Sequence, residues 1–287
     1  MRAFELPAGL ESIPIRAYWV FQYQLGRQVV VPALRRRGAF QPGYAVAEIG
    51  SGEGGVLMAF VAEGAASALA TDIETPRLAL GRQIATQLNW PVTFVEHNIL
   101  TDPIPEAWHG RYDLVLLRDT LEHLESPETA LLQIARLLRP GGYLYISFPP
   151  YYSPFGGHQH LLRTFWGKLP YMHLLPNPLF QRLTAQGQEP GRSEVRRLRH
   201  IRLSFRRFLR AVQVTGYRVL FQEHYLLRPA FRFRLRLPLP VVTLTGPCRH
   251  LPDLFQFICT EASYILQWPY TSTIPSQPLP QNSKDFS

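Results

Sequence analysis

The sequence predicts an α/β protein built on a doubly wound parallel sheet. From Tyr44 onward, short apolar runs alternate with segments of helical periodicity, the pattern of repeated strand–helix–strand units. A glycine-rich segment, Gly50–Gly55, follows the first apolar run, and Asp72 ends the second. The chain has 287 residues, 46% hydrophobic and 18% charged, which is enough to bury the core that such a sheet needs.

The first half of the alternation contains five expected strands and three expected helices. The strands are expected at residues 44–49, 67–72, 92–97, 112–117 and 142–148, with helices near 54–63, 76–89 and 127–138. The last helix is the clearest, because Ser126 is a suitable N-cap and Pro127 suits the first helical position. The segment Arg139–Gly142 is expected to end it.

Other segments flank this alternation. Residues 14–37 read as a helix that Pro32 kinks or breaks, and residues 149–200 read as an ordered, irregular insertion with short helices. Ser204 is expected to cap a helix that reaches Thr215 and stops at Gly216. The remaining strands are expected at 217–226 and 257–266. We therefore expect a helical cover, a sheet core, an insertion, a C-terminal part of the same domain and a disordered tail, at 1–43, 44–148, 149–200, 201–268 and 269–287.

The net charge of +9 is carried mainly by arginine. Basic residues concentrate at Arg35–Arg37 and from Arg192 to Arg210, which favours an anionic partner such as nucleic acid, anionic lipid or an acidic substrate; a solvated face is the alternative. Arginine also alternates with apolar residues over Phe231–Leu237, the two-residue period of a strand. Peripheral membrane contact through residues 14–37 and 231–237 is therefore kept as an option.

The sequence contains neither a run of about 18 apolar residues nor a basic N-terminus followed by an apolar stretch. Cys248 and Cys259 are too few for a disulfide framework and lack metal-ligand spacing. We expect a cytoplasmic protein.

The glycine segment fits two cofactors. Gly50–Gly55 has the spacing G-x-G-x-x-G, and Asp72 lies where an acidic side chain contacts a ribose, so a dinucleotide is permitted. However, Glu48 and Glu53 bring negative charge to the loop, which disfavours a pyrophosphate and suits a cofactor with sulfonium and ammonium groups.

Three further strings follow in order: Tyr112–Val115, Asp119–Leu124 with its Leu-Glu-His core, and Leu137–Leu144 with Pro-Gly-Gly. With the E-x-G-x-G loop, they resemble the class I S-adenosylmethionine-dependent methyltransferases, in particular the type 11/12-like group with an L-E-H segment. The resemblance covers residues 44–150 and continues more weakly to 266. It implies a Rossmann-like, seven-stranded, mostly parallel sheet with an antiparallel C-terminal hairpin, helices on both faces and an irregular insertion after the fifth strand.

The resemblance also implies a cofactor, S-adenosyl-L-methionine, and a set of residues that bind it. Asp72 would bind the ribose hydroxyls, with Ile73 beside the adenine. The position that usually holds Asp is Asn98 here, whose carbonyl can still accept a hydrogen bond. The full expected set is Glu48, Gly50, Ser51, Gly52, Asp72, Ile73, Asn98, Ile99 and Arg118.

Methyl transfer requires an aligned acceptor and, where needed, a base that removes its proton. The candidate bases are His123, His158 and His160; a purely structural role is the alternative for His123. Asp119, Glu122 and His123 also form a D-x-x-E-H pattern, which His158 would extend to an oxygen/nitrogen metal set. This set resembles those of some metal-assisted O-methyltransferases, which usually have Glu at the first position. From the sequence we assign no metal, because many relatives carry L-E-H without one.

We therefore expect a methyltransferase acting on oxygen or nitrogen of a small or lipid-linked acceptor that the insertion 149–200 covers. Two alternatives stay open: a nicotinamide-dependent oxidoreductase, and a basic RNA- or membrane-binding adaptor on a methyltransferase scaffold.

Overall fold

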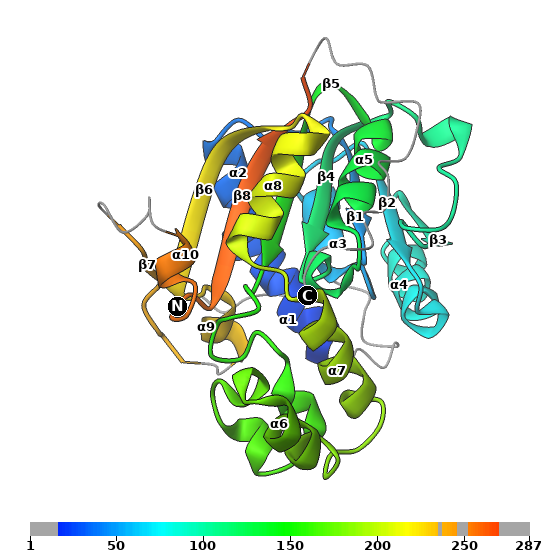
Figure 1. Ribbon diagram of the computed structural model, residues 1–287. Helices are drawn as coiled ribbons and strands as arrows, with labels where there is room; N and C mark the ends of the chain where they lie inside the picture. Colours follow the sequence, from blue (N-terminus) through cyan, green and yellow to red (C-terminus); the bar gives the residue numbers. More distant parts are fainter. Residues whose placement is uncertain (1–16, 235–236, 246–251, 270–287) are drawn as a thin grey trace.

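The computed structural model describes residues 17–234, 237–245 and 252–269. A single sheet in the strand order β3-β2-β1-β4-β5-β8-β6-β7 forms the centre (Figure 1). Its strands are β1 Ala45–Ile49, β2 Ser67–Asp72, β3 Val92–Glu96, β4 Tyr112–Arg118, β5 Leu138–Phe148, β6 Arg218–Leu227, β7 Val242–Thr243 and β8 Glu261–Gln267.

The first five strands pair in parallel, whereas β8 runs antiparallel to both β5 and β6. The expected mostly parallel sheet with an antiparallel C-terminal pair is thus confirmed. An eighth strand, the two-residue β7 at the sheet edge, was not predicted.

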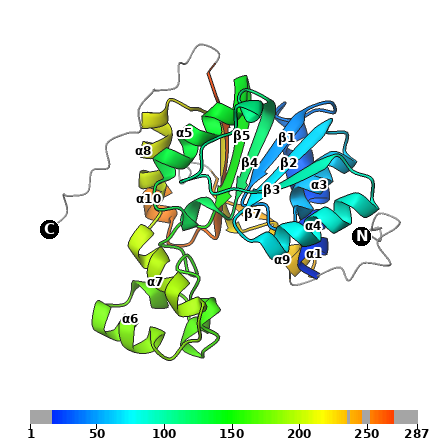
Figure 2. The same ribbon diagram turned by 90° about the vertical axis from the view of Figure 1, so that its right-hand side faces the viewer.

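Helices cover both faces of the sheet (Figure 2). Because side chains alternate along a strand, neighbouring residues of β1 enter opposite cores. Val46 packs in the core under α1–α4, and Ala47 packs in the core under α5 and α8. The helices are α1 Ala17–Leu25, α2 Val31–Arg36, α3 Gly55–Ala62, α4 Thr75–Gln87, α5 Pro127–Leu137, α6 Asn177–Thr184, α7 Gly191–Ile201, α8 Phe205–Thr215, α9 Ala230–Arg234 and α10 Pro252–Phe255.

The expected strand at 142–148 was too short. The helix α5 ends at Leu137, and β5 begins at once at Leu138, so Arg139–Gly142 is part of a strand rather than a free turn. The β4–β5 register shifts between Tyr112 and Leu114, which lets the chain leave the helix directly into the sheet.

Two other expectations need correction. Of the two outcomes predicted for Pro32, a kink or a break, the break is wrong: α1 continues through a π-helical turn, Gly26–Val30, into α2, which contains Pro32 in its first turn. The segment after Pro229 is not extended, because Ala230–Arg234 forms the short helix α9. The rest of the N-terminal segment and residues 235–236 lie outside the described residues, as do Cys248 and the tail beyond Pro269.

The insertion after β5 forms a small lobe beside the carboxyl ends of the parallel strands (Figures 1 and 2). It contains three 3₁₀ turns, Gln159–Leu162, Trp166–Lys168 and Met172–Leu174, followed by α6 and α7. A core of its own holds the lobe together; its buried members are Leu162, Met172, Phe180, Leu183 and Val195.

The arginine-rich stretch 192–210 spans α7 and α8, two amphipathic helices. Ser204 caps α8 by accepting a hydrogen bond from the N–H of Arg207 at 3.1 Å, and Gly216 ends it in the left-handed conformation, as expected. Phe205 and Phe208 are fully buried in the core under β5 and β8. Apart from Arg202, which lies between the two helices, the arginines of this stretch therefore belong to folded helices.

Within the described residues, no helix combines the length and the apolar character needed to cross a membrane.

Candidate active site

The glycine segment forms the turn between β1 and α3. Gly50, Gly52 and Gly54 all have positive φ angles, between 56° and 72°, a region that glycine enters without strain. A Cβ at Gly50 would overlap the side chain of Thr120, which follows β4. The turn thus needs glycine both for its conformation and for its close approach to the neighbouring loop.

Asp72 ties this turn to the end of β2. Its Oδ2 accepts a hydrogen bond from the N–H of Gly52 at 2.7 Å, and its Oδ1 accepts one from the N–H of Glu74 at 2.9 Å. The strands β1, β2 and β4 are parallel neighbours, so their carboxyl ends meet at one edge of the sheet. This edge carries the turn, Asp72 and the residues after β4.

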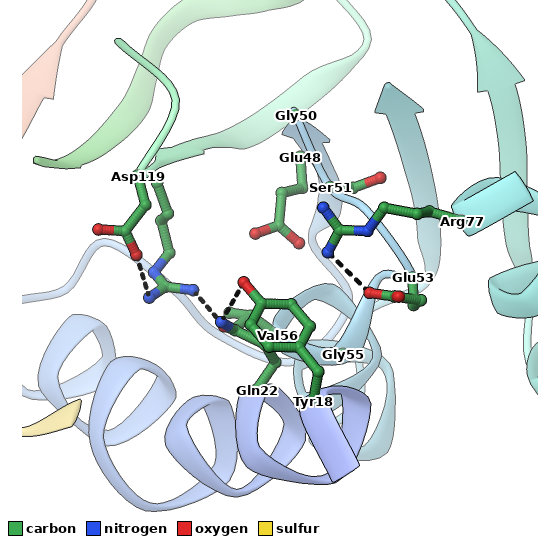
Figure 3. A pocket seen from close by; sticks show the side chains of 11 residues that line it. Tyr18, Gln22, Glu48, Gly50, Ser51, Glu53, Gly55, Val56, Arg77 and Asp119 are labelled. Atoms are coloured by element: carbon green, nitrogen blue, oxygen red, sulfur yellow. Dashed lines mark hydrogen bonds and ion pairs between the residues drawn. The ribbon is translucent and has the colours of Figure 1, made fainter. Parts of the chain in front are cut away.

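A small pocket opens at this edge (Figure 3). Four of the expected cofactor residues line it: Glu48, Gly50, Ser51 and Arg118. The remaining lining comes from the helix α1, the glycine turn, the start of α3, the start of α4 and the residue after β4, namely Tyr18, Gln22, Glu53, Gly55, Val56, Arg77 and Asp119.

The floor of the pocket is charged. The carboxylate of Glu48 is buried and accepts a hydrogen bond from the N–H of Leu57 at 3.1 Å. Burial raises the pKa of Glu48 to about 7, although the nearby guanidinium of Arg118 acts in the opposite direction. Arg118 is itself buried, and it donates to Oε1 of Gln22 at 3.1 Å.

Glu53 has a partner that the sequence did not suggest. Nη2 of Arg77, on α4, lies 2.7 Å from Oε2 of Glu53, and the guanidinium stands 5.2 Å from the ring centre of Tyr18. The negative charge of Glu53 is therefore compensated within the protein. The other acidic groups of the lining are Glu48 and Asp119. Tyr18, Gln22 and Arg77 were missed because no local pattern connects them with the glycine turn.

The residues expected around an adenine lie beside this lining rather than within it. Ile73 is 65% exposed, and Ile99 is buried in the hydrophobic core. The Oδ1 atom of Asn98 accepts a hydrogen bond from the N–H of Leu100 at 3.0 Å, which leaves one lone pair of this oxygen for a ligand.

The three candidate histidines lie together beyond Asp119. The ring centres of His123 and His158 are 4.9 Å apart, and those of His158 and His160 are 5.7 Å apart. Glu122 and Glu194 complete this group, which we call the histidine cluster. Nδ1 of His123 lies 2.5 Å from Oε1 of Glu194, which comes from α7 of the insertion and was missed by the sequence.

Charge and burial act differently on the members of the histidine cluster. Burial lowers the pKa of His123, but the hydrogen bond with Glu194 and the charge of Glu122 outweigh it, and the net shift is upward. Burial, reinforced by His123 and His160, lowers the pKa of His158 to about 3. Burial raises the pKa of Glu122.

Asp119 does not join the histidine cluster. Its Oδ1 lies 3.2 Å from Nη1 of Arg228, and Oε2 of Glu261 lies 2.9 Å from the same nitrogen. Arg118 approaches Asp119 from the other side, at 3.7 Å. The expected four-residue metal set is therefore reduced to Glu122, His123 and His158, whose ligand atoms lie within 4.8 Å of one another.

Comparison with known proteins agrees with this fold. Residues 47–146 match the family model of a methyltransferase domain. The ubiquinone biosynthesis O-methyltransferase of Photorhabdus laumondii is 30% identical over 105 residues, 37% of this chain and 42% of that protein. Its counterpart in Acinetobacter baumannii strain ACICU is 31% identical over 106 residues, 37% of this chain and 44% of that protein. The match thus spans less than half of each relative.

Among solved structures, geranyl diphosphate C-methyltransferase from Streptomyces coelicolor, determined with Mg²⁺, geranyl diphosphate and S-adenosyl-L-homocysteine, has a TM-score of 0.54. The likeness covers 91% of this chain and 89% of that one at 14% identity, so it shows the fold alone. Residues 47–146 are therefore similar to a methyltransferase domain, and the solved structure shares the fold. Neither alternative function is favoured by these comparisons.

Proposed function

We propose that this chain transfers a methyl group from S-adenosylmethionine to an oxygen or nitrogen atom of a small or lipid-linked acceptor. One observation carries the proposal: the glycine turn, Glu48 and Arg118 line one pocket at the carboxyl ends of β1 and β4, within the matched domain. Oxygen is the favoured acceptor atom, because the matched relatives are named as O-methyltransferases.

The residues around the pocket suit this cofactor. When bound, the cofactor supplies an electrophilic methyl group on a sulfonium. Glu48 and Asp119 would face its cationic groups, and Arg118 its carboxylate. Two buried polar atoms of the lining, Oγ of Ser51 and Nε of Arg118, have no hydrogen-bond partner within the described part of the chain and would gain one from a polar ligand.

The rest of the expected set keeps its proposed roles. Asp72 would accept hydrogen bonds from the ribose hydroxyls while it holds the turn. Each of its carboxylate oxygens has two lone pairs and accepts one hydrogen bond from a backbone N–H, which leaves one lone pair for the ribose. Gly50 and Gly52 would let the ligand approach main-chain atoms. Ile73, Asn98 and Ile99 would border the adenine.

The acceptor would enter from the side of the histidine cluster, under the insertion lobe. Its lone pair would attack the methyl carbon, the C–S bonding pair would remain on sulfur, and the acceptor proton would leave to a base. His123, His158 and His160 are our candidates for that base. His160 is the exposed member, so a proton taken up there can pass to solvent.

Affinity for S-adenosylhomocysteine is expected to rise about tenfold from pH 6 to pH 8. The pKa of Glu48 in the free protein, about 7, makes this carboxyl mostly neutral at pH 6 and mostly ionised at pH 8, and the ionised form binds cations. Isothermal titration calorimetry at several pH values measures this. The isosteric Glu48→Gln variant should bind more weakly and without the pH step; a wild-type affinity that stays constant over this range would contradict the role of Glu48.

Transfer itself is tested with methyl-labelled S-adenosylmethionine and a panel of catechols, phenols, primary amines and lipid-extractable polyprenyl phenols. We expect label on the oxygen of at least one phenolic acceptor, identified by mass spectrometry. Heat-inactivated protein gives the background. Tight cofactor binding with no transfer to any acceptor class would contradict the enzymatic proposal and favour a binding protein.

A further inference from the structure

The histidine cluster contains three side chains whose ligand atoms converge. Oε1 of Glu122 lies 3.7 Å from Nε2 of His123 and 3.9 Å from Nε2 of His158. All three ligand atoms lie within 4.8 Å of one another. Zn²⁺ binds histidine nitrogens at about 2.0–2.1 Å and carboxylate oxygens at about 2.0–2.2 Å, so a cation between these atoms requires only small side-chain movements.

Glu122 has an unsatisfied carboxylate. Its side chain is only 3% exposed, and neither oxygen has a hydrogen-bond partner among the residues that the structure describes. A buried polar group without a partner costs about 1–3 kcal/mol, and more when it is charged. A cation held by Glu122 would remove this cost.

His123 is oriented as a metal ligand would be. Its Nδ1 contacts Oε1 of Glu194, and this carboxylate is held by Arg197 through contacts of 3.0 and 3.1 Å. Arg197 also donates to the carbonyl oxygen of His123 at 2.8 Å. A carboxylate on one ring nitrogen fixes the ring and its tautomer and leaves the other nitrogen, Nε2, free to bind a metal.

His158 is brought to the cluster by an unusual backbone conformation. Its φ angle is 49°, in the left-handed region that non-glycine residues seldom adopt, and it follows Gly156 and Gly157. Strain of this kind persists where the surrounding structure enforces it, often at ligand sites. Gly157 approaches the side chain of His173, which leaves no room there for a Cβ.

We propose that Glu122, His123 and His158 bind one divalent transition-metal ion, with Zn²⁺ the preferred probe. Asp119 pairs with Arg228, so the donors are one carboxylate and two imidazoles, a set that suits zinc and its first-row neighbours better than Mg²⁺. Three protein ligands leave a coordination position for an acceptor oxygen, and with the metal bound His160 is the candidate base that stays outside the ligand set. That last role rests on the proposed methyl transfer, whereas metal binding does not.

The test uses the full chain, stripped with chelator, dialysed and titrated calorimetrically with ZnCl₂, MnCl₂ and MgCl₂ separately, with bound metal counted by mass spectrometry. We expect one equivalent of Zn²⁺ and much weaker Mg²⁺ binding. Glu122→Gln and His158→Asn should each weaken Zn²⁺ binding more than about 100-fold, and Glu194→Gln about 10–100-fold, as expected for a residue that orients a ligand.

His200→Asn is the matched control, because His200 is an exposed residue of α7 outside the cluster. It should bind Zn²⁺ like the wild type. Circular dichroism identifies any variant that fails to fold, and Zn²⁺ binding is then compared among the variants that do fold. Failure of the wild type to bind Zn²⁺ or Mn²⁺, or unchanged binding in folded Glu122→Gln and His158→Asn, would overturn the inference. Titration of the same samples with S-adenosylhomocysteine separates the two proposals: cofactor binding without metal binding refutes only the metal site, and the reverse refutes only the proposed function.

Discussion

Gly50→Ala is expected to weaken binding of S-adenosylhomocysteine by at least about tenfold and to lower the free energy of unfolding by about 1–3 kcal/mol. Gly50 has a φ angle of 70°, and the added methyl group would overlap the side chain of Thr120. Thr120 donates to the carbonyl oxygen of Arg118 at 2.9 Å, so its displacement disturbs another part of the pocket. Calorimetric titration and urea unfolding measure the two effects.

Gly38→Ala is the matched control for this prediction. Gly38 has the same φ angle of 70°, but a Cβ there would meet nothing within 4 Å. This variant should show only the conformational cost, about 1–2 kcal/mol, with cofactor affinity unchanged. If Gly50→Ala binds S-adenosylhomocysteine as tightly as Gly38→Ala does, the pocket is not the cofactor site.

Arg228→Met is expected to reduce the free energy of unfolding by about 3 kcal/mol, the lower end of the cost of breaking a buried ion pair. The guanidinium of Arg228 contacts Asp119 at 3.2 Å and Glu261 at 2.9 Å, and its side chain is only 16% exposed. Without it, two carboxylates remain in a largely buried position. Asp119 is a third exposed, which keeps the expected cost at the lower end of the range.

Urea unfolding followed by circular dichroism measures this effect, and Arg196→Met provides the same substitution on an exposed residue of α7. The control should change stability by no more than about 0.5 kcal/mol. Equal stability of the two variants would show that the contacts of Arg228 with Asp119 and Glu261 contribute nothing to the fold.

The parallel strands were predictable because burial dictates their composition. The expected range 67–72 for β2 matches the structure, and the range for β4 ends one residue early. Both strands are packed on two faces, so they read as continuous apolar runs. The glycine turn was equally predictable, because its positive φ angles require glycine.

The short helix α9 could not be predicted from its sequence pattern. Phe231–Arg234 alternates like a strand, but four residues are too few for periodicity to separate helix from strand. The boundary between α5 and β5 was predicted wrongly for a related reason. Pro140 and Gly141 are typical of turns, but they also occur where a strand is irregular, as at the start of β5, where the register with β4 shifts.

The candidate site was predictable only where its residues are near in sequence. Glu48 and Gly50 follow one strand, and Glu122 and His123 follow another. Tyr18, Glu194 and Arg228 reach the site through tertiary packing, from elements that carry no local signal of it. For example, Asp119 pairs with Arg228 instead of joining the histidine cluster, and Arg228 lies more than a hundred residues later in the chain.

The central claim, that the pocket beside Glu48 and the glycine turn holds S-adenosylmethionine, is tested most directly by calorimetric titration of the wild-type chain. S-adenosylhomocysteine and NADH are titrated in parallel under identical conditions. The pocket lining predicts saturable 1:1 binding of S-adenosylhomocysteine and no measurable binding of NADH. Binding of NADH without binding of S-adenosylhomocysteine would contradict the claim and make the chain a nicotinamide-dependent protein.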